Sequence, residues 1–157
     1  MKKYILTTLL LMGLGTSLSA GINTFKGSQR ACNVGDTMGC FNLGLMYEKG
    51  QAVKQNYFMA EKFYAKACDG GDMQGCYNLG AMYVQGKGVK QDEFMAKILF
   101  GKACDGEIAR GCFNLGIMYY NGLGVKQDDF KAKELFGKAC DGGDAEGCKN
   151  YAIMNKR

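Results

Sequence analysis

An all-α solenoid of antiparallel helix pairs is the fold class that the sequence predicts, and three regularities predict it. Pairs of cysteines eight positions apart recur every 36 residues, apolar residues recur at helical spacing, and glycine-rich loops separate the apolar segments. A repeat of about 20 to 50 residues is typical of solenoids, in which each unit packs on its neighbours. The eight cysteines are Cys32, Cys40, Cys68, Cys76, Cys104, Cys112, Cys140 and Cys148.

The second full copy of the repeat shows the two helices of each pair. Residues 73–85 place apolar side chains three and four positions apart on one side of a helix, here named A, which Gly86 is expected to end. Asp92 is suited to cap a second helix, named B, which is expected to end near Cys104. Helix B is expected to bury Phe94, Ala96, Leu99, Phe100 and Ala103. Two helices in each 36-residue copy form a tetratricopeptide-like arrangement.

Small residues recur at fixed positions of both helices. Helix A carries Gly39, Gly75, Gly111 and Gly147, and helix B carries Ala67, Ala103 and Ala139. A glycine inside a helix costs up to about 1 kcal/mol, so its return in every copy predicts that two helices approach each other closely there.

A disulfide in every copy is expected, because residues 1–20 have the pattern of a secretory signal peptide and the cysteines of an exported chain meet an oxidising compartment. Pairing across 28 positions, such as Cys40 with Cys68, would leave two cysteines without partners. Pairing across eight positions uses them all and is favoured: Cys32-Cys40, Cys68-Cys76, Cys104-Cys112 and Cys140-Cys148. Bridged Cα atoms lie within about 7 Å, whereas eight residues of helix span about 12 Å. The chain must therefore turn back between them, at sequences such as residues 69–72, where glycine ends one helix and aspartate caps the next.

Residues 1–20 have the pattern of a secretory signal peptide, and residues 21–157 form the predicted solenoid of four cysteine-linked units. Two lysines precede an apolar run that is too short to span a bilayer, and a small-residue stretch follows. The remaining chain has 18 basic and 15 acidic residues, a net charge of +3, and no nucleic-acid partner is expected. We expect a secreted or periplasmic monomer without membrane insertion. Because histidine and CxxC pairs are absent from the sequence, neither a metal nor a cofactor is expected.

Three sequence strings resemble Sel1-like repeats over about residues 30–154: NLGxMY in helix A, GxGVKQD in the loop and AxxxFxKAC in helix B. With a cysteine pair in every copy, the chain is similar to the Helicobacter cysteine-rich protein family, which consists of exported Sel1-like solenoids. Two copies depart from the pattern. The first has Ala52 in place of a loop glycine, and the third has Glu107 and Ile108 in place of the Gly-Asp turn.

One polar position of helix A is the same in every copy, as Asn42, Asn78, Asn114 and Asn150. Asparagine is disfavoured inside helices because its side chain competes for backbone hydrogen bonds, so its recurrence requires a reason. In one interpretation the carboxamides bind the backbone of an extended peptide. In the other, each asparagine satisfies a buried backbone group of the neighbouring repeat. Variable polar residues on the same stripe, before and after the asparagine, are further candidate ligand contacts: Gln74, Arg110, Gln85 and Asn121.

Two functions are consistent with the sequence. The first is an interaction module that binds a peptide, a peptidoglycan-like cell-wall fragment or a protein partner on the concave face lined by the A helices. The second is implied by the resemblance alone, since the family is described as penicillin-binding with weak β-lactamase activity; a β-lactam would then be the ligand. Ser28 does not begin an SxxK motif, and neither SDN nor KTG occurs, so no catalytic residue is assigned.

Overall fold

The computed structural model describes residues 24–156, and this part of the chain is entirely helical apart from its turns and loops. The helices are α2 (Phe25–Asn33), α3 (Thr37–Lys49), α4 (Tyr57–Asp69), α5 (Met73–Gln85), α6 (Glu93–Asp105), α7 (Ala109–Asn121), α8 (Asp129–Asp141) and α9 (Ala145–Met154). The A helices are α3, α5, α7 and α9, and the B helices are α2, α4, α6 and α8. The predicted signal peptide lies outside the described residues.

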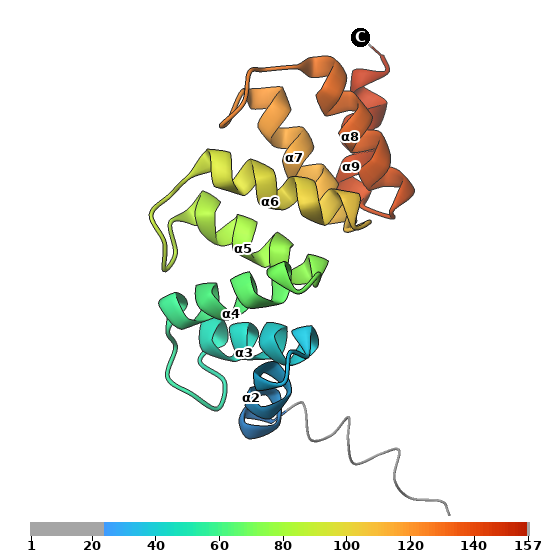
Figure 1. Ribbon diagram of the computed structural model, residues 1–157. Coiled ribbons are helices and arrows are strands. Elements are labelled where there is room, and N and C mark those ends of the chain that lie inside the picture. Colours follow the sequence, from blue (N-terminus) through green and yellow to red (C-terminus); the bar gives the residue numbers. More distant parts are fainter. Residues whose placement is uncertain (1–23, 157) are drawn as a thin grey trace, which may run out of the picture.

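The helices stack in chain order, from α2 at the bottom of Figure 1 to α8 and α9 at the top. Extensive contacts join each helix only to the helices before and after it in the chain. This nearest-neighbour packing is what a solenoid requires, because each repeat buries its apolar face against the next one. The predicted fold class is confirmed.

The helix boundaries predicted from the second copy agree with the structure. Helix α5 ends at Gly86, whose φ of 64° is left-handed. Helix α6 follows Asp92, whose carboxylate accepts a hydrogen bond of 2.9 Å from the backbone N–H of Met95. The glycine and the aspartate act here as the caps that their positions predicted.

The prediction that helix B buries Phe94 is wrong, because this side chain is 56% exposed. Its equivalents Phe58 and Phe130 are also exposed. Residue 94 lies two positions before the first buried residue of the helix, and a step of two places it on another face. The buried residues of α6 are Ala96, Leu99, Phe100, Ala103 and Cys104.

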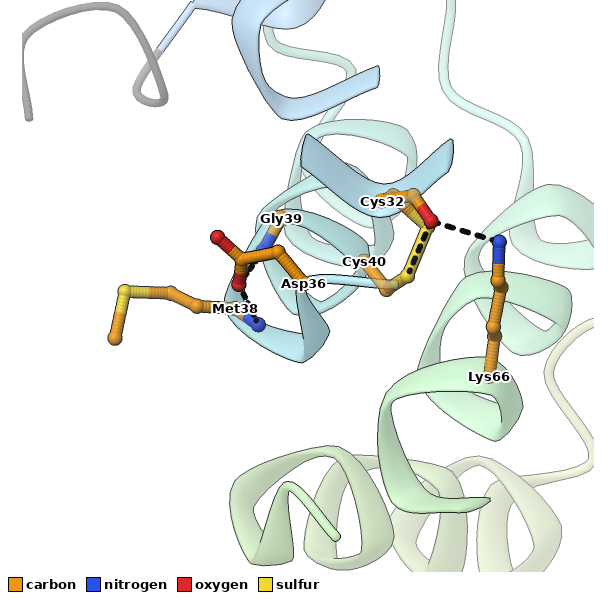
Figure 2. The surroundings of a disulfide bond; sticks show 6 residues. All are labelled: Cys32, Asp36, Met38, Gly39, Cys40 and Lys66. Atoms are coloured by element: carbon orange, nitrogen blue, oxygen red, sulfur yellow. Dashed lines mark hydrogen bonds between the residues drawn. A yellow bond between two sulfur atoms is a disulfide. The ribbon is translucent and has the colours of Figure 1, made fainter. Parts of the chain in front are cut away.

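Four disulfides connect each B helix to the following A helix in the predicted pairing, with Cα–Cα distances between 4.3 and 4.6 Å. Figure 2 shows the first of them, Cys32 with Cys40. Asp36 caps α3 beside this bridge, and Lys66 of the next B helix donates a 2.8 Å hydrogen bond to the Cys32 carbonyl. Each disulfide therefore fastens the turn between two repeats.

Glycine permits the close approach of the two helices at each disulfide. A Cβ atom added at Gly75 would lie 2.9 Å from the Cβ of Ala67, and one added at Gly111 would lie 2.8 Å from the Cβ of Ala103. These separations are shorter than ordinary van der Waals contact. The close packing predicted from the recurring small residues is confirmed.

The first copy tolerates Ala52 in a left-handed conformation, with a φ of 61°. At the equivalent position of the second copy, a Cβ added to Gly88 would lie 2.5 Å from the carbonyl carbon of Tyr57 in the preceding B helix. The residue that would correspond to Tyr57 for the first loop lies before the described part of the chain. Glycine is therefore required in the later loops by a close backbone contact as well as by its dihedral angle.

The third copy keeps the shape of its B-to-A turn without the usual residues. Gly71 has a φ of 96°, and Glu107 at the equivalent position has a φ of 64°. Ile108 then precedes α7 without a capping hydrogen bond, whereas Asp72 accepts one from Gly75 at the start of α5. Ile108 instead packs against an apolar cluster. This turn therefore has an apolar contact where the second copy has a capping hydrogen bond.

The Glu107→Gly substitution is expected to raise the free energy of unfolding by about 0.5–1 kcal/mol, because glycine adopts a positive φ without steric penalty. The thermal midpoint should rise by a few degrees in a circular dichroism melt of the oxidised chain. The reverse change at the matched turn, Gly71→Glu, should lower the midpoint. A lower midpoint for Glu107→Gly would show that the glutamate side chain stabilises the turn in another way.

Candidate functional site

Two cavities lie between consecutive A helices and are built from equivalent residues of successive repeats. The α5–α7 pocket has a volume of about 210 Å³ and is lined by Tyr77, Ala81, Val84, Gln85, Glu93, Phe100, Asn114, Ile117, Met118 and Leu123. The α7–α9 pocket has a volume of about 360 Å³ and is lined by Ile117, Tyr120, Asn121, Phe136, Asn150, Ile153 and Met154. Every residue of the second set stands 36 positions after a residue of the first. The period therefore produces a row of similar pockets, here named the A-helix groove.

The predicted asparagine stripe contributes one carboxamide to each pocket. Asn114 lines the α5–α7 pocket and Asn150 lines the α7–α9 pocket, and both side chains are half-buried. The carboxamides of these two residues and of Asn42 make no hydrogen bond to another described residue. The carboxamides of Asn114 and Asn150 thus retain donors and acceptors that no described residue uses.

Asn78 differs from the other members of the stripe because it has a polar neighbour within the protein. The hydroxyl of Tyr64, which is fully buried, donates a 2.5 Å hydrogen bond to the Glu48 carboxylate and also interacts with the Asn78 side chain. Burial, followed by the hydrogen bond to Glu48 and its charge, raises the pKa of Tyr64 far above its ordinary value. At the junction between the first two A helices, the stripe asparagine therefore has a polar partner within the chain itself.

The variable polar residues of the stripe divide into two groups. Gln85 lies in the same pocket as Asn114, and Asn121 lies in the same pocket as Asn150. The side-chain amide of Asn121 also donates a 3.0 Å hydrogen bond to the Ile117 carbonyl. The structure therefore joins each pocket asparagine with a polar residue from the end of the preceding A helix. Gln74 and Arg110 are exposed and line neither pocket.

Several pocket residues were not singled out from the sequence as ligand contacts. Phe100 and Phe136 come from the B helices, and Glu93 and Leu123 come from the start of a B helix and from a loop. Alignment of the copies would have shown that Tyr64 of the first repeat stands at the position of Phe100 and Phe136 in the later repeats. It would not have shown which of these residues face a common space.

Ser28 is completely buried within α2 and is thus out of reach of a β-lactam in this structure. Among the described residues, no group of three or more histidine, cysteine, aspartate or glutamate side chains could hold a metal ion. No helix in residues 24–156 has the length and apolar character needed to cross a bilayer.

Comparison with known proteins agrees with the repeat structure. The Sel1 repeat family matches residues 37–72, 74–107 and 109–144, which is more than half of the chain. No curated protein sequence matches the chain.

Three solved structures resemble the chain over most of its length. A protective antigen of uropathogenic Escherichia coli with an SLR fold has a TM-score of 0.81 and 28% identity over 85% of this chain, which spans only 29% of the antigen. A Sel1 repeat protein from Oxalobacter formigenes has a TM-score of 0.76 and 28% identity, with 82% of this chain and 96% of that protein covered. Cysteine-rich protein B from Helicobacter pylori has a TM-score of 0.65 and 30% identity, with coverages of 87% and 98%.

The four disulfides and the similarity to the Helicobacter protein indicate an oxidising, extracytoplasmic environment. The repeat match, the bridged B-to-A turns and the structural similarity are consistent with one another. The chain belongs to the Sel1 repeat family and, within it, to the cysteine-rich proteins of the Helicobacter type.

Proposed function

We propose that the chain is an extracytoplasmic interaction scaffold whose A-helix groove binds an extended peptide segment of a protein partner. Sel1 repeat proteins generally act as scaffolds for protein interactions, which supports a protein partner for this chain. The observation that carries the proposal is the pair of equivalent pockets, each with a half-buried asparagine whose carboxamide lacks a hydrogen-bond partner among the described residues. Cell-wall peptides offer the same amide groups and are the related ligand class.

The chemistry of each pocket suits a peptide. A carboxamide can donate to a peptide carbonyl and accept from a peptide N–H at the same time, so it matches the backbone whatever the ligand sequence. Phe100 and Phe136 supply an apolar surface beside the carboxamides of Asn114 and Asn150. Apolar walls with a few placed polar groups are typical of ligand sites.

A structural role within the protein is supported at one position of the stripe only, and there through a side-chain hydroxyl instead of the backbone group that the sequence suggested. Asn78 interacts with the Tyr64 hydroxyl, whereas Asn114 and Asn150 have no such neighbour because phenylalanine replaces that tyrosine in the later copies. The β-lactam alternative rests on the family resemblance, and the burial of Ser28 gives it no support.

Replacement of Asn114 and Asn150 together by alanine is expected to weaken peptide binding at least tenfold, because each change removes hydrogen bonds of about 1 kcal/mol. The melting temperature should change little, since alanine favours the helix and no intramolecular hydrogen bond is lost. Peptides selected from a random phage-displayed library by the oxidised chain would be labelled, and their affinity measured by fluorescence anisotropy.

Asn33→Ala is the matched control, because Asn33 is exposed at the end of α2 and lines neither pocket. Its affinity should equal that of the unmodified chain. Unchanged affinity in the double variant would contradict the proposal. A large loss of stability in that variant would favour the structural interpretation instead.

A further inference from the structure

We infer that the α5–α7 pocket binds a lysine-type side chain of the peptide, meaning an aliphatic stem that ends in a primary ammonium group. This inference rests on the proposed function, because it assigns one side chain of the peptide whose backbone the asparagines would bind. Three features of the pocket lining support this inference: its apolar surface, its single acidic residue and the absence of basic residues.

The walls of the pocket fit an aliphatic stem. Val84 is 41% exposed and Leu123 is 37% exposed, and both line the cavity together with Phe100. Lysine side chains bury their methylene groups along such surfaces while the ammonium stays near water. The stem would cover apolar area that the protein alone leaves in contact with solvent.

Glu93 is the one charged residue among those that line the pocket. This residue begins α6 and is half-buried, and its carboxylate makes no hydrogen bond or ion pair with the described residues. No lysine or arginine lines the cavity. A cation at the end of the ligand side chain would therefore meet a carboxylate that has no competing partner, and an acidic ligand side chain would be repelled.

The other junctions lack this combination. At the first junction, Tyr57 stands in place of Glu93 and Lys87 in place of Leu123, and the Lys87 ammonium lies 5.6 Å from the Tyr57 ring centroid. That position already holds a cation and would disfavour a second one. At the α7–α9 pocket, Asp129 is the equivalent of Glu93 but does not line the cavity. A lysine of the ligand would thus select the α5–α7 pocket and fix the register of the peptide.

Nuclear magnetic resonance titration of the full oxidised chain tests the inference with two small probes, N-acetyl-lysine N-methylamide and N-acetyl-norleucine N-methylamide. Both probes should shift the methyl signals of Val84, Ile117 and Leu123. The lysine probe should bind about fivefold more tightly than the norleucine probe, the expected contribution of a partly exposed ion pair. In the Glu93→Gln variant the two affinities should agree within about twofold.

Two further variants use the natural differences between the copies. Leu123→Lys introduces the residue of the first junction and is expected to abolish binding of the lysine probe. Asp129→Asn removes the equivalent carboxylate outside the cavity and should leave the lysine preference unchanged.

Equal affinity for the two probes, absence of methyl shifts with either probe, or a lysine preference that persists in Glu93→Gln would overturn the inference. The proposed function is judged separately by the asparagine variant. If the affinity of the selected peptides depends on Asn114 and Asn150 but is not increased by a lysine, the proposed peptide binding stands and only the lysine pocket is rejected.

Discussion

Reduction of the four disulfides is expected to unfold the chain at room temperature. The chain-entropy model assigns about 2.5 kcal/mol to a bridge that closes a loop of eight residues. Four such bridges contribute about 10 kcal/mol, which is comparable to the whole stability of an ordinary small domain. The far-ultraviolet circular dichroism signal of the helices should therefore be lost on addition of tris(2-carboxyethyl)phosphine and should return after reoxidation.

Variants that lack a single disulfide serve as controls for the reduction experiment. Cys68→Ala with Cys76→Ala severs an interior junction between buried cysteines, whereas Cys140→Ala with Cys148→Ala frees only α9, where both cysteines are half-buried. The interior pair should lower the free energy of unfolding more than the terminal pair. A reduced chain that keeps its helical signal and melts at the same temperature would contradict the expectation.

The location of the bridges explains why their loss should be so damaging. Contacts within an A–B pair, such as α7 with α8, are more extensive than those across a bridged turn, such as α6 with α7. The disulfides thus reinforce the smaller of the two interfaces that alternate along the solenoid. Because a repeat protein holds together through contacts between neighbours, weakening these junctions separates the helix pairs.

Most of the fold could be predicted because each structural device recurs at the same period. The cap at Asp92, the left-handed glycine at 86 and the cysteine pairs each appear in several copies, so a pattern in one copy is checked by the others. Phe94 shows where this reasoning fails. Repetition indicates that a residue matters, but it does not say which face of the helix carries it, and Phe94, near the helix start, lies on an exposed face.

The candidate site could be predicted only in part. The asparagine stripe follows from the period, but each pocket combines residues of two A helices, a B helix and, for Leu123, a loop. Which of these meet depends on how the helices stack, and a periodic sequence does not specify that geometry. The buried contact of Tyr64 with Glu48 required the structure for the same reason, since the two residues lie in different helices and differ from their counterparts in the later copies.

Gly111→Ala is expected to lower the free energy of unfolding by about 1–3 kcal/mol, although alanine is the better helix former. The added Cβ would lie 2.8 Å from the Cβ of Ala103 and 3.0 Å from the backbone nitrogen of Cys104. The Cys104-Cys112 bridge holds the two helices at a Cα–Cα distance of 4.4 Å, so they cannot separate to relieve the overlap. Urea unfolding of the oxidised chain measures the change.

Gly101→Ala provides the matched comparison, because Gly101 also lies inside a helix but a Cβ added there meets no atom within 4 Å. This substitution should raise stability by up to about 1 kcal/mol through helix propensity alone. The two substitutions therefore distinguish the effect of helix packing on stability from that of helix propensity. The same change should lower the free energy of unfolding at position 111 and raise it at position 101. Stabilisation by both changes would mean that the helices adjust their separation despite the bridge, and the recurring glycine would then need a reason other than close approach.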